Sequence, residues 1–558
     1  MNLNSKNEVQ INMRTRYGEN RSITGEYDPS LAVRCQNGTF VCGKTGNVFV
    51  FKGIPFAKPP VGKLRWKAPQ PVEDNDGIFE AYYNGKTPIQ SEWKTEVASY
   101  YPQSEDCLYL NIWLNGADKT PQKPVMVFFH GGSYGWGGTA DPMYDGKSFV
   151  SKQSDIILVT VGYRVGLMGF VDFSSVKGGE AFPDAPNLGL LDQIEALRWI
   201  RKNIAAFGGN PENVTIFGES AGGGSVSLLP IIPQAKGLFR RVIAESGSVA
   251  LTYSKKECNL FTEKLLKETK AKSMQDLMNL SEQELMEVNE EVNHINNFPQ
   301  RDGKLIPLNP YLPYENGDTA DVDILIGTNS NEMNYWIGEV GGIVPYRMTI
   351  PVKFENDLKS LNRSEKKLVK QFMHGLKGHN LWRMTEFYNE LMFRLPAIRQ
   401  AEEHAKHGGK AYMYYWTVPS ALPLRKACHA VELAYVFGNL DETIYTGERA
   451  DEELSDTIMQ LWTNFARTGN PSTDRLEWPQ YDETDRLSLV ISKEPQTAAD
   501  VLQKQRELLS PLLNRMINPS YATLDYNVPF VRKAIAGGLL ALTGIAATAY
   551  FAVKLIEN

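Results

Sequence analysis

Cysteine is scarce in this chain of 558 residues, and the five cysteines present form no CxxC pair. They are Cys35, Cys42, Cys107, Cys258 and Cys428. So sparse and odd a set argues against a disulfide framework and fits a reducing compartment, and no bond is expected even between Cys35 and Cys42. A basic excess is missing as well, because 59 Lys and Arg stand against 65 Asp and Glu, for a net charge of −6. We therefore expect no nucleic-acid partner.

Apolar runs are missing from the start of the chain. The first 30 residues are polar, so we predict an N-terminal tail rather than a secretory signal. No internal repeat and no long low-complexity linker follows. Hydrophobic residues make up 42% of the whole chain, and the part that follows the tail is long enough for a large globular core.

One long uncharged run stands near the C-terminus. Residues 534–553 are 20 residues without a charge, flanked by cations, which is the length needed to cross about 30 Å of hydrocarbon. We predict a transmembrane helix over residues 532–555, joined by a linker over 519–531 to a globular domain over 31–518. The alternative is a buried C-terminal helix. Because no signal is expected, the prediction is a single-pass membrane protein whose globular domain faces the cytoplasm.

The rest of the sequence alternates apolar runs with amphipathic segments. Strands are predicted over residues 125–132, 155–164, 215–220, 241–246, 323–329 and 411–417. A helix is predicted over residues 192–211, where glycines and a proline stop it. Near-continuous apolar strands separated by helices predict an α/β protein with a mostly parallel sheet covered on both faces. Residues 276–293 and 355–372 are charge-rich and helical, and we expect them to form cap insertions outside the sheet.

The segment TIFGESAGGG places Ser220 between Gly218 and Gly222, directly after a predicted strand. This matches G-x-S-x-G, the nucleophile elbow, in which a serine sits on a strained turn between a strand and a helix. The neighbours two positions away must be small for the turn to close. A plain glycine-rich loop is the alternative, but the strand before the motif and the helix after it favour the elbow.

A serine hydroxyl needs a base and a group that orients the base, and in this fold the order is serine, acid, histidine. Of seven histidines, His429 lies between small residues and an apolar helical run, as a loop base should. His404 and His407 are expected on a solvated helix face. Glu332 follows the predicted strand at 323–329, where sites in α/β proteins form, although a surface glutamate is the alternative.

The third requirement is a set of N–H donors for an oxyanion. His130-Gly131-Gly132-Ser133 follows a predicted strand and is similar to the HGGG-type loop that supplies such donors. The other donor would be the N–H of Ala221, directly after Ser220. Nearby Tyr134 and Trp136 fit an aromatic pocket and a packed core equally well.

Taken together, these motifs resemble the type-B carboxylesterases, a family of α/β-hydrolases that includes cholinesterases and liver-type esterases. The matching segments are residues 51–71, 104–113, 187–223, 427–439, 462–472 and 477–482. The resemblance covers roughly residues 33–482. It implies an α/β-hydrolase fold with helical cap insertions and a serine esterase that uses no metal and no cofactor.

Carried to this sequence, the resemblance implies that Ser220 is the nucleophile, His429 the base and Glu332 the orienting acid; we call these three the candidate triad. It implies an oxyanion hole made by the N–H groups of Gly132, Ser133 and Ala221. It also implies that Glu219 lies near the histidine and that Ser246 lies close to the triad.

Two departures from the family pattern stand out. Ser133 replaces the third glycine of many members, although its N–H is retained. Cys107 matches a family cysteine whose expected partner position falls in TPIQ, residues 87–90, where there is no cysteine. Because the disulfide-bounded choline loop is therefore absent, we do not expect choline esters as substrates.

The predicted function is hydrolysis of small-molecule carboxylic esters through an acyl-enzyme. Two alternatives remain. A lipase or an acyltransferase would use the same triad. A catalytically silent, membrane-anchored adhesion protein of the same family would keep the fold without the chemistry.

Overall fold

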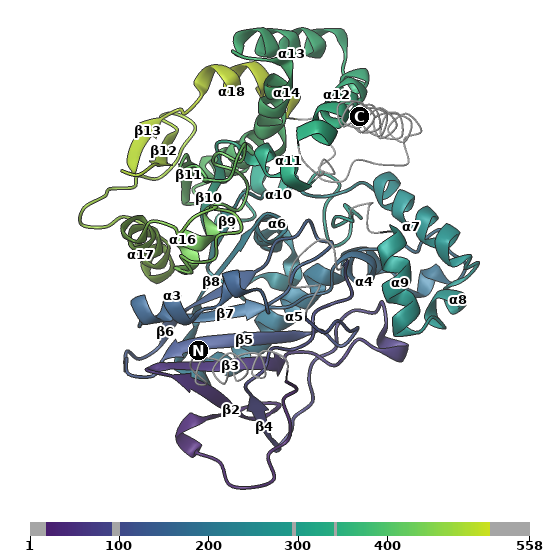
Figure 1. Cartoon of the computed structure of the whole chain (residues 1–558), viewed down its shortest axis with the longest axis vertical. Coiled ribbons are helices and arrows are strands. Elements are labelled where there is room, and N and C mark those ends of the chain that lie inside the picture. Colours follow the sequence, from purple (N-terminus) through teal and green to yellow (C-terminus); the bar gives the residue numbers. More distant parts are fainter. Residues whose placement is uncertain (1–17, 92–100, 293–296, 340–342, 514–558) are drawn as a thin grey trace, which may run out of the picture.

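The apolar runs of the sequence form the strands of one thirteen-stranded sheet (Figure 1). The computed structural model describes residues 18–91, 101–292, 297–339 and 343–513. The strands are β1 (Ala32–Cys35), β2 (Gly38–Thr45), β3 (Val48–Pro55), β4 (Ile78–Ala81), β5 (Tyr109–Asn115), β6 (Lys123–Phe129), β7 (Ile157–Val161), β8 (Gly209–Glu219), β9 (Arg241–Glu245), β10 (Asp323–Asn329), β11 (Ala411–Trp416), β12 (Leu487–Ile491) and β13 (Gln496–Ala499). Their order is β1-β2-β3-β5-β7-β6-β8-β9-β10-β11-β12-β13, with β4 beside β2.

The centre of this sheet is parallel, as the sequence predicts. Every neighbouring pair from β7 to β12 is parallel, and the strands there are apolar and buried because helices cover both faces. The edges differ, because β1, β2, β3, β5 and β7 pair antiparallel, as do β12 and β13. A two-residue turn with Gly46 at φ +58° joins β2 to β3, and so short a connection permits only an antiparallel pair.

The helix predicted over residues 192–211 begins earlier and ends earlier. It is α5 (Leu188–Asn203), continued by a 3₁₀ turn, η6 (Ile204–Phe207). Gly208, at φ +85°, ends it in the left-handed conformation that glycine adopts without strain. Strand β8 starts at the next residue, so Gly208 ends the helix and Gly209 already belongs to the strand.

The two predicted cap helices are each divided in two. The first becomes α8 (Met274–Met278) and α9 (Glu282–Val292), and the second lies within α12 (Ile343–Ser360) and α13 (Arg363–Gly375). In each break a polar side chain caps the second helix: Ser281 Oγ accepts from the N–H of Glu284, and Asn362 forms a capping box with Glu365. Figure 1 shows α8 and α9, with α7 (Lys255–Thr269), in one group outside the sheet, and α12 and α13, with α14 (Asn380–Tyr388), in another.

The described part of the predicted N-terminal tail is attached to the sheet. Ile23 N–H donates to the carbonyl of Ile78 on β4, and Asn20 Nδ2 donates to the carbonyls of Lys52 and Tyr83. At the other end, the predicted linker and transmembrane helix lie outside the described residues. Among the helices that are described, none is both long and apolar enough to span a bilayer.

Candidate active site

Ser220 lies on a strained turn between β8 and helix α6 (Ala221–Leu228). Its backbone has φ 57° and ψ −116°, a combination that non-glycine residues adopt only where the surroundings enforce it. The turn is held to the neighbouring strand, because the N–H of Ser220 donates to the carbonyl of Glu245 at the end of β9, at 2.8 Å. The structure therefore gives the GESAG motif the conformation of a nucleophile elbow.

The glycines on either side of Ser220 are a steric requirement of this turn. A Cβ on Gly222 would lie 1.9 Å from the carbonyl oxygen of Phe129. One on Gly218 would lie 2.6 Å from the same oxygen and 2.6 Å from the carbonyl carbon of Gly222. The end of β6 and the start of α6 are thus packed backbone against backbone, and no larger residue fits between them.

Glu332 and His429 are joined by a hydrogen bond at 2.7 Å between Oε2 and Nδ1. Glu332 opens a 3₁₀ turn, η9 (Glu332–Asn334), just after β10, and it is fully buried. Its other oxygen, Oε1, accepts from Ser246 Oγ and from the N–H of Asn329, both at 2.7 Å. Both carboxylate oxygens are thereby fixed, and with them the plane of the His429 ring.

The loop that carries His429 is tied to the loop that carries Glu332. The N–H of Asn331 donates to the carbonyl of Ala427 at 2.9 Å, and Asn329 Nδ2 donates to the carbonyl of Cys428 at 2.9 Å. The same amide of Asn329 contacts Glu432 Oε2 at 2.5 Å. The acid and the base therefore sit on two loops that form one hydrogen-bonded unit.

Glu219 lies on the other side of His429. Its Oε1 is 3.1 Å from His429 Nε2, and neither atom forms a hydrogen bond within the described residues. Burial, together with the charges of Glu332 and Glu245, holds the pKa of Glu219 well above its ordinary value. Burial likewise raises the pKa of Glu432 and raises the pKa of Glu245 to about 8. At pH 7 Glu245 is therefore mostly protonated, and the raised pKa values of Glu219 and Glu432 favour their neutral forms, which limits the negative charge beside Glu332.

The loop after β6 lies directly against the serine turn. A Cβ on Gly131 would be 3.2 Å from the Cβ of Ser220. Gly132 has φ +101° and Ser133 φ +52°, so the chain turns sharply here. In the described residues, no backbone carbonyl accepts from the N–H of Gly132, Ser133 or Ala221. Ala221 is the first residue of α6, where N–H groups have no partner within the helix and the helix dipole favours an anion.

His130, at the start of that loop, has a structural role. Its ring stacks on Tyr163 at 4.4 Å, and burial lowers its pKa to about 4. Tyr134 is also a core residue, since it is fully buried against Phe170 and Phe298. Of the two interpretations that the sequence left open for Tyr134, the structure supports core packing.

Sequence reasoning did not assign the aromatic rings beside His429 to the site. Trp336 lies 5.0 Å and Phe393 5.1 Å from the His429 ring, and the two rings stack on each other at 5.7 Å. Tyr335 adds a third ring at 5.9 Å. The NEMNYW segment contains two of these rings close to Glu332, so a signal existed for them. Phe393 comes from a distant helical segment and has no motif.

Two expectations about other side chains can be compared with the structure. His404 is buried rather than solvated: its Nδ1 lies 3.0 Å from Thr319 Oγ1, and the expectation of an exposed face is wrong for it. All five cysteines are buried and free, including Cys107. This agrees with the missing disulfide partner.

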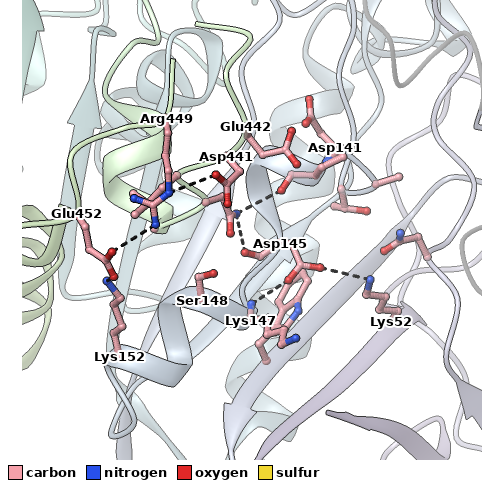
Figure 2. A pocket seen from close by; sticks show the side chains of 18 residues that line it. Lys52, Asp141, Asp145, Lys147, Ser148, Lys152, Asp441, Glu442, Arg449 and Glu452 are labelled. Carbon is pink, nitrogen blue, oxygen red and sulfur yellow. Dashed lines mark hydrogen bonds and ion pairs between the residues drawn. The ribbon is translucent and has the colours of Figure 1, made fainter. Parts of the chain in front are cut away.

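A polar pocket of about 560 Å³ lies where residues 139–148, which follow the Gly132 loop, meet residues 438–452. Figure 2 shows ion pairs among its charged side chains: Arg449 lies 3.3 Å from both Asp441 and Glu452, and Lys52 lies 3.7 Å from Asp145. Among the described residues that line it, there is no member of the candidate triad. The pocket is therefore a feature separate from the serine site, with its charges largely compensated.

A serine on a strained strand-to-helix turn in a mixed, mostly parallel sheet places this chain among the α/β-hydrolases. A profile of the carboxylesterase family matches residues 33–509. The chain therefore belongs to the carboxylesterase family, which includes ester hydrolases such as the relatives below.

Individual relatives agree with this assignment. The para-nitrobenzyl esterase of Bacillus subtilis (strain 168) is 37% identical over 491 residues, which cover 84% of this chain and 97% of that protein. Carboxylesterase 1E of Rattus norvegicus is 33% identical over 528 residues, covering 84% and 91%. The crystal structure of a carboxylesterase of Geobacillus stearothermophilus at pH 6.2 aligns with a TM-score of 0.77 at 31% identity, covering 86% of this chain and 99% of that one.

Proposed function

We propose that the protein is a serine carboxylesterase that hydrolyses small carboxylic esters through an acyl-enzyme on Ser220. The observation that carries the proposal is the hydrogen bond of 2.7 Å between Glu332 and His429, in the same molecule as a strained serine turn. An oriented imidazole is what a serine hydroxyl requires to become a nucleophile at neutral pH.

In the first half of the reaction, Ser220 Oγ attacks the ester carbonyl carbon and His429 Nε2 takes its proton. The carbonyl oxygen becomes an oxyanion, for which the N–H groups of Gly132, Ser133 and Ala221 are the proposed donors. His429 then returns the proton to the departing alkoxide, the bond between carbon and the leaving oxygen breaks, and the acyl group stays on Ser220.

In the second half, water replaces the alcohol. His429 removes a proton from the water as it attacks the acyl carbon, and gives that proton back to Ser220 Oγ when the acid departs. Throughout, Glu332 holds the Nδ1–H of the ring and stabilises the imidazolium that forms twice in each cycle. Ser246 supports Glu332 by donating to its other oxygen.

Glu219 is assigned an electrostatic role. Burial and the neighbouring carboxyls raise its pKa and favour its neutral form, which weakens any ion pair with an imidazolium although its Oε1 lies 3.1 Å from His429 Nε2. The approach of substrate then replaces this contact with the serine and the leaving group, since catalytic hydrogen bonds often tighten only once substrate is bound.

We also propose that residues 532–555 anchor the protein to a membrane, with the catalytic domain on the cytoplasmic side. The support is the uncharged run at 534–553, which is long enough to span a bilayer and is flanked by cations.

The function is tested by hydrolysis of nitrophenyl esters of increasing acyl length, with the full chain in detergent and Ser220→Ala as the paired variant. We expect wild-type turnover and covalent labelling by a fluorophosphonate probe, both lost in Ser220→Ala. A folded wild type that neither turns over nor becomes labelled would refute the proposal and favour a silent, binding-only family member. Transfer of the acyl group to added alcohols in preference to water would favour an acyltransferase instead.

A further inference from the structure

The 3₁₀ turn that carries Glu332 is not capped by its own first residues. The side chain of Asn331, at the N-cap position of η9, makes no capping hydrogen bond. The first N–H groups of such a turn need partners when they are buried. The N–H of Met333 finds one in Asn389 Oδ1 at 2.9 Å, although 56 residues separate the two in sequence. The cap is therefore supplied from another element.

The amide of Asn389 is held in one orientation. Its Nδ2 donates to Glu386 Oε2 at 2.9 Å and lies 3.5 Å from the carbonyl oxygen of Ser330. A flipped amide would turn its NH₂ group toward the N–H of Met333 and its oxygen toward the carboxylate, and both contacts would be repulsive. Glu386 thus fixes the amide, and the amide contacts the chain on both sides of Glu332, at residues 330 and 333.

A local irregularity of the helix brings Asn389 to this position. Asn389 opens η10 (Asn389–Arg394), a π-helical turn between α14 and α15 (Leu395–Lys406). Single π turns within α-helices frequently occur at functional sites. The same turn carries Phe393, whose ring lies 5.1 Å from that of His429. One turn therefore touches both the Glu332 loop and the imidazole.

We propose that Asn389 is a positioning residue for ester hydrolysis, which keeps Glu332 in line with His429 while Glu386 keeps the Asn389 amide in the right orientation. This inference rests on the proposed function. It assigns to η10 and the end of α14 a part in aligning the acid and the base. The side chain acts only through Glu332, so its removal should slow the chemical step and leave substrate binding nearly unchanged.

The test uses four full-length proteins at pH 8 with a nitrophenyl ester. They are the wild type, Glu386→Gln, Asn389→Asp and the double variant. In the wild type Glu386 is mostly ionised at this pH, because burial and Glu390 raise its pKa only to about 7. Asn389→Asp keeps an acceptor for the N–H of Met333 but replaces the donor to Glu386 by a second carboxyl, which repels Glu386 when both are ionised. In the double variant the new amide at position 386 donates to the new carboxylate at position 389, so donor and acceptor have changed places.

We expect Asn389→Asp to lower kcat by about 10- to 100-fold with KM little changed, since a displacement of about 1 Å at the reacting groups costs up to about 100-fold. Glu386→Gln alone should stay within about threefold of wild type, because its amide oxygen still accepts from Asn389, and the double variant should recover kcat to a similar level. Melting temperatures measured in parallel separate a loss of fold from a loss of alignment.

A double variant that stays as slow as Asn389→Asp, or a single variant with wild-type kcat, overturns the inference while leaving the proposed function intact. The inference is also overturned if kcat falls and KM rises only in variants whose melting temperature has dropped, because that pattern indicates a loss of fold. A wild-type protein without any esterase activity would instead refute the proposed function, and this inference with it.

Discussion

Oε2 of Glu332 lies 2.7 Å from Nδ1 of His429, although 97 residues separate them in the sequence. The two are brought together by loops that share backbone hydrogen bonds, including one from the N–H of Asn331 to the carbonyl of Ala427. Most of the testable consequences of the structure concern how firmly this pair and the serine turn are held.

Replacing Glu332 by glutamine should nearly abolish turnover. The variant keeps the shape of the side chain but loses the charge that stabilises the imidazolium, and kcat should fall by about 10⁴-fold. Ser246→Ala, which removes one donor to Glu332, should cost only about 10- to 100-fold, because a hydrogen bond to a charged group contributes about 1.5–3 kcal/mol. Steady-state kinetics on one nitrophenyl ester compare the two variants, and equal losses would contradict the assigned roles.

Alanine at position 222 should disrupt the serine turn. Its Cβ would meet the carbonyl oxygen of Phe129 at 1.9 Å, and backbone on both sides prevents relaxation. We expect a loss of at least about 3 kcal/mol in the free energy of unfolding. The matched control is Gly375→Ala at the end of α13, where a Cβ meets nothing within 4 Å and the helix should gain about 0.5–1 kcal/mol. Urea denaturation measures both, and a Gly222→Ala protein as stable as the control would contradict the packing described.

Stability should depend on pH through Glu245. Burial raises the pKa of this carboxyl from its ordinary value near 4.5 to about 8 in the folded state. Between these values the native state binds more protons than the unfolded state, so the free energy of unfolding falls as pH rises, by up to about 1.4 kcal/mol per pH unit. Glu245→Gln lacks this titration and can still accept from Trp462 Nε1.

The measurement for Glu245 is the unfolding free energy of both proteins at several pH values from 5 to 8. The unfolding free energy of wild type minus that of Glu245→Gln should fall steadily as pH rises across this range. A difference that stays constant with pH would show that the carboxyl does not titrate there.

Charges in the C-terminal run should release the protein from membranes. Leu540→Arg combined with Ala547→Arg preserves length while each charge costs about 2.5–3.5 kcal/mol at the centre of a membrane helix. We expect wild type in the membrane fraction after alkaline washing and the double variant in the supernatant, with unchanged ester turnover. Wild type in the supernatant would refute the anchor, and loss of activity in the variant would show that the run belongs to the catalytic domain.

The sequence predicts the serine turn and the parallel centre of the sheet because both follow from local rules. Glycine spacing around Ser220 is a short-range steric demand, and apolar strands between helices pair in parallel. For the base, local chemistry offers several histidines, and the resemblance to a family directs the choice to His429. The catalytic roles of the candidate triad remain predictions that the experiments above test.

The rest depends on contacts between distant segments. Phe393 and Asn389 reach the site through the π turn between α14 and α15, and no local pattern marks that turn. The antiparallel edge is not among the predictions, although the glycine turn between β2 and β3 is a readable signal for it. For His404 the inward spacing of Ala397 and Ala401 on the same helix indicates burial, but the polar composition of the segment conceals it.

The backbone contacts around Ser220 leave little room for substitutions in the serine turn itself. No side chain can be added at Gly218 or Gly222, and both oxygens of Glu332 are already engaged. Changes that adapt the protein to a new ester are therefore expected outside this turn, for example at Trp336 and Phe393, whose rings lie 5.0 Å and 5.1 Å from the His429 ring. A mutagenesis library aimed at these two aromatic positions is expected to sample substrate preference, whereas one aimed at the serine turn would mainly sample unfolded chains.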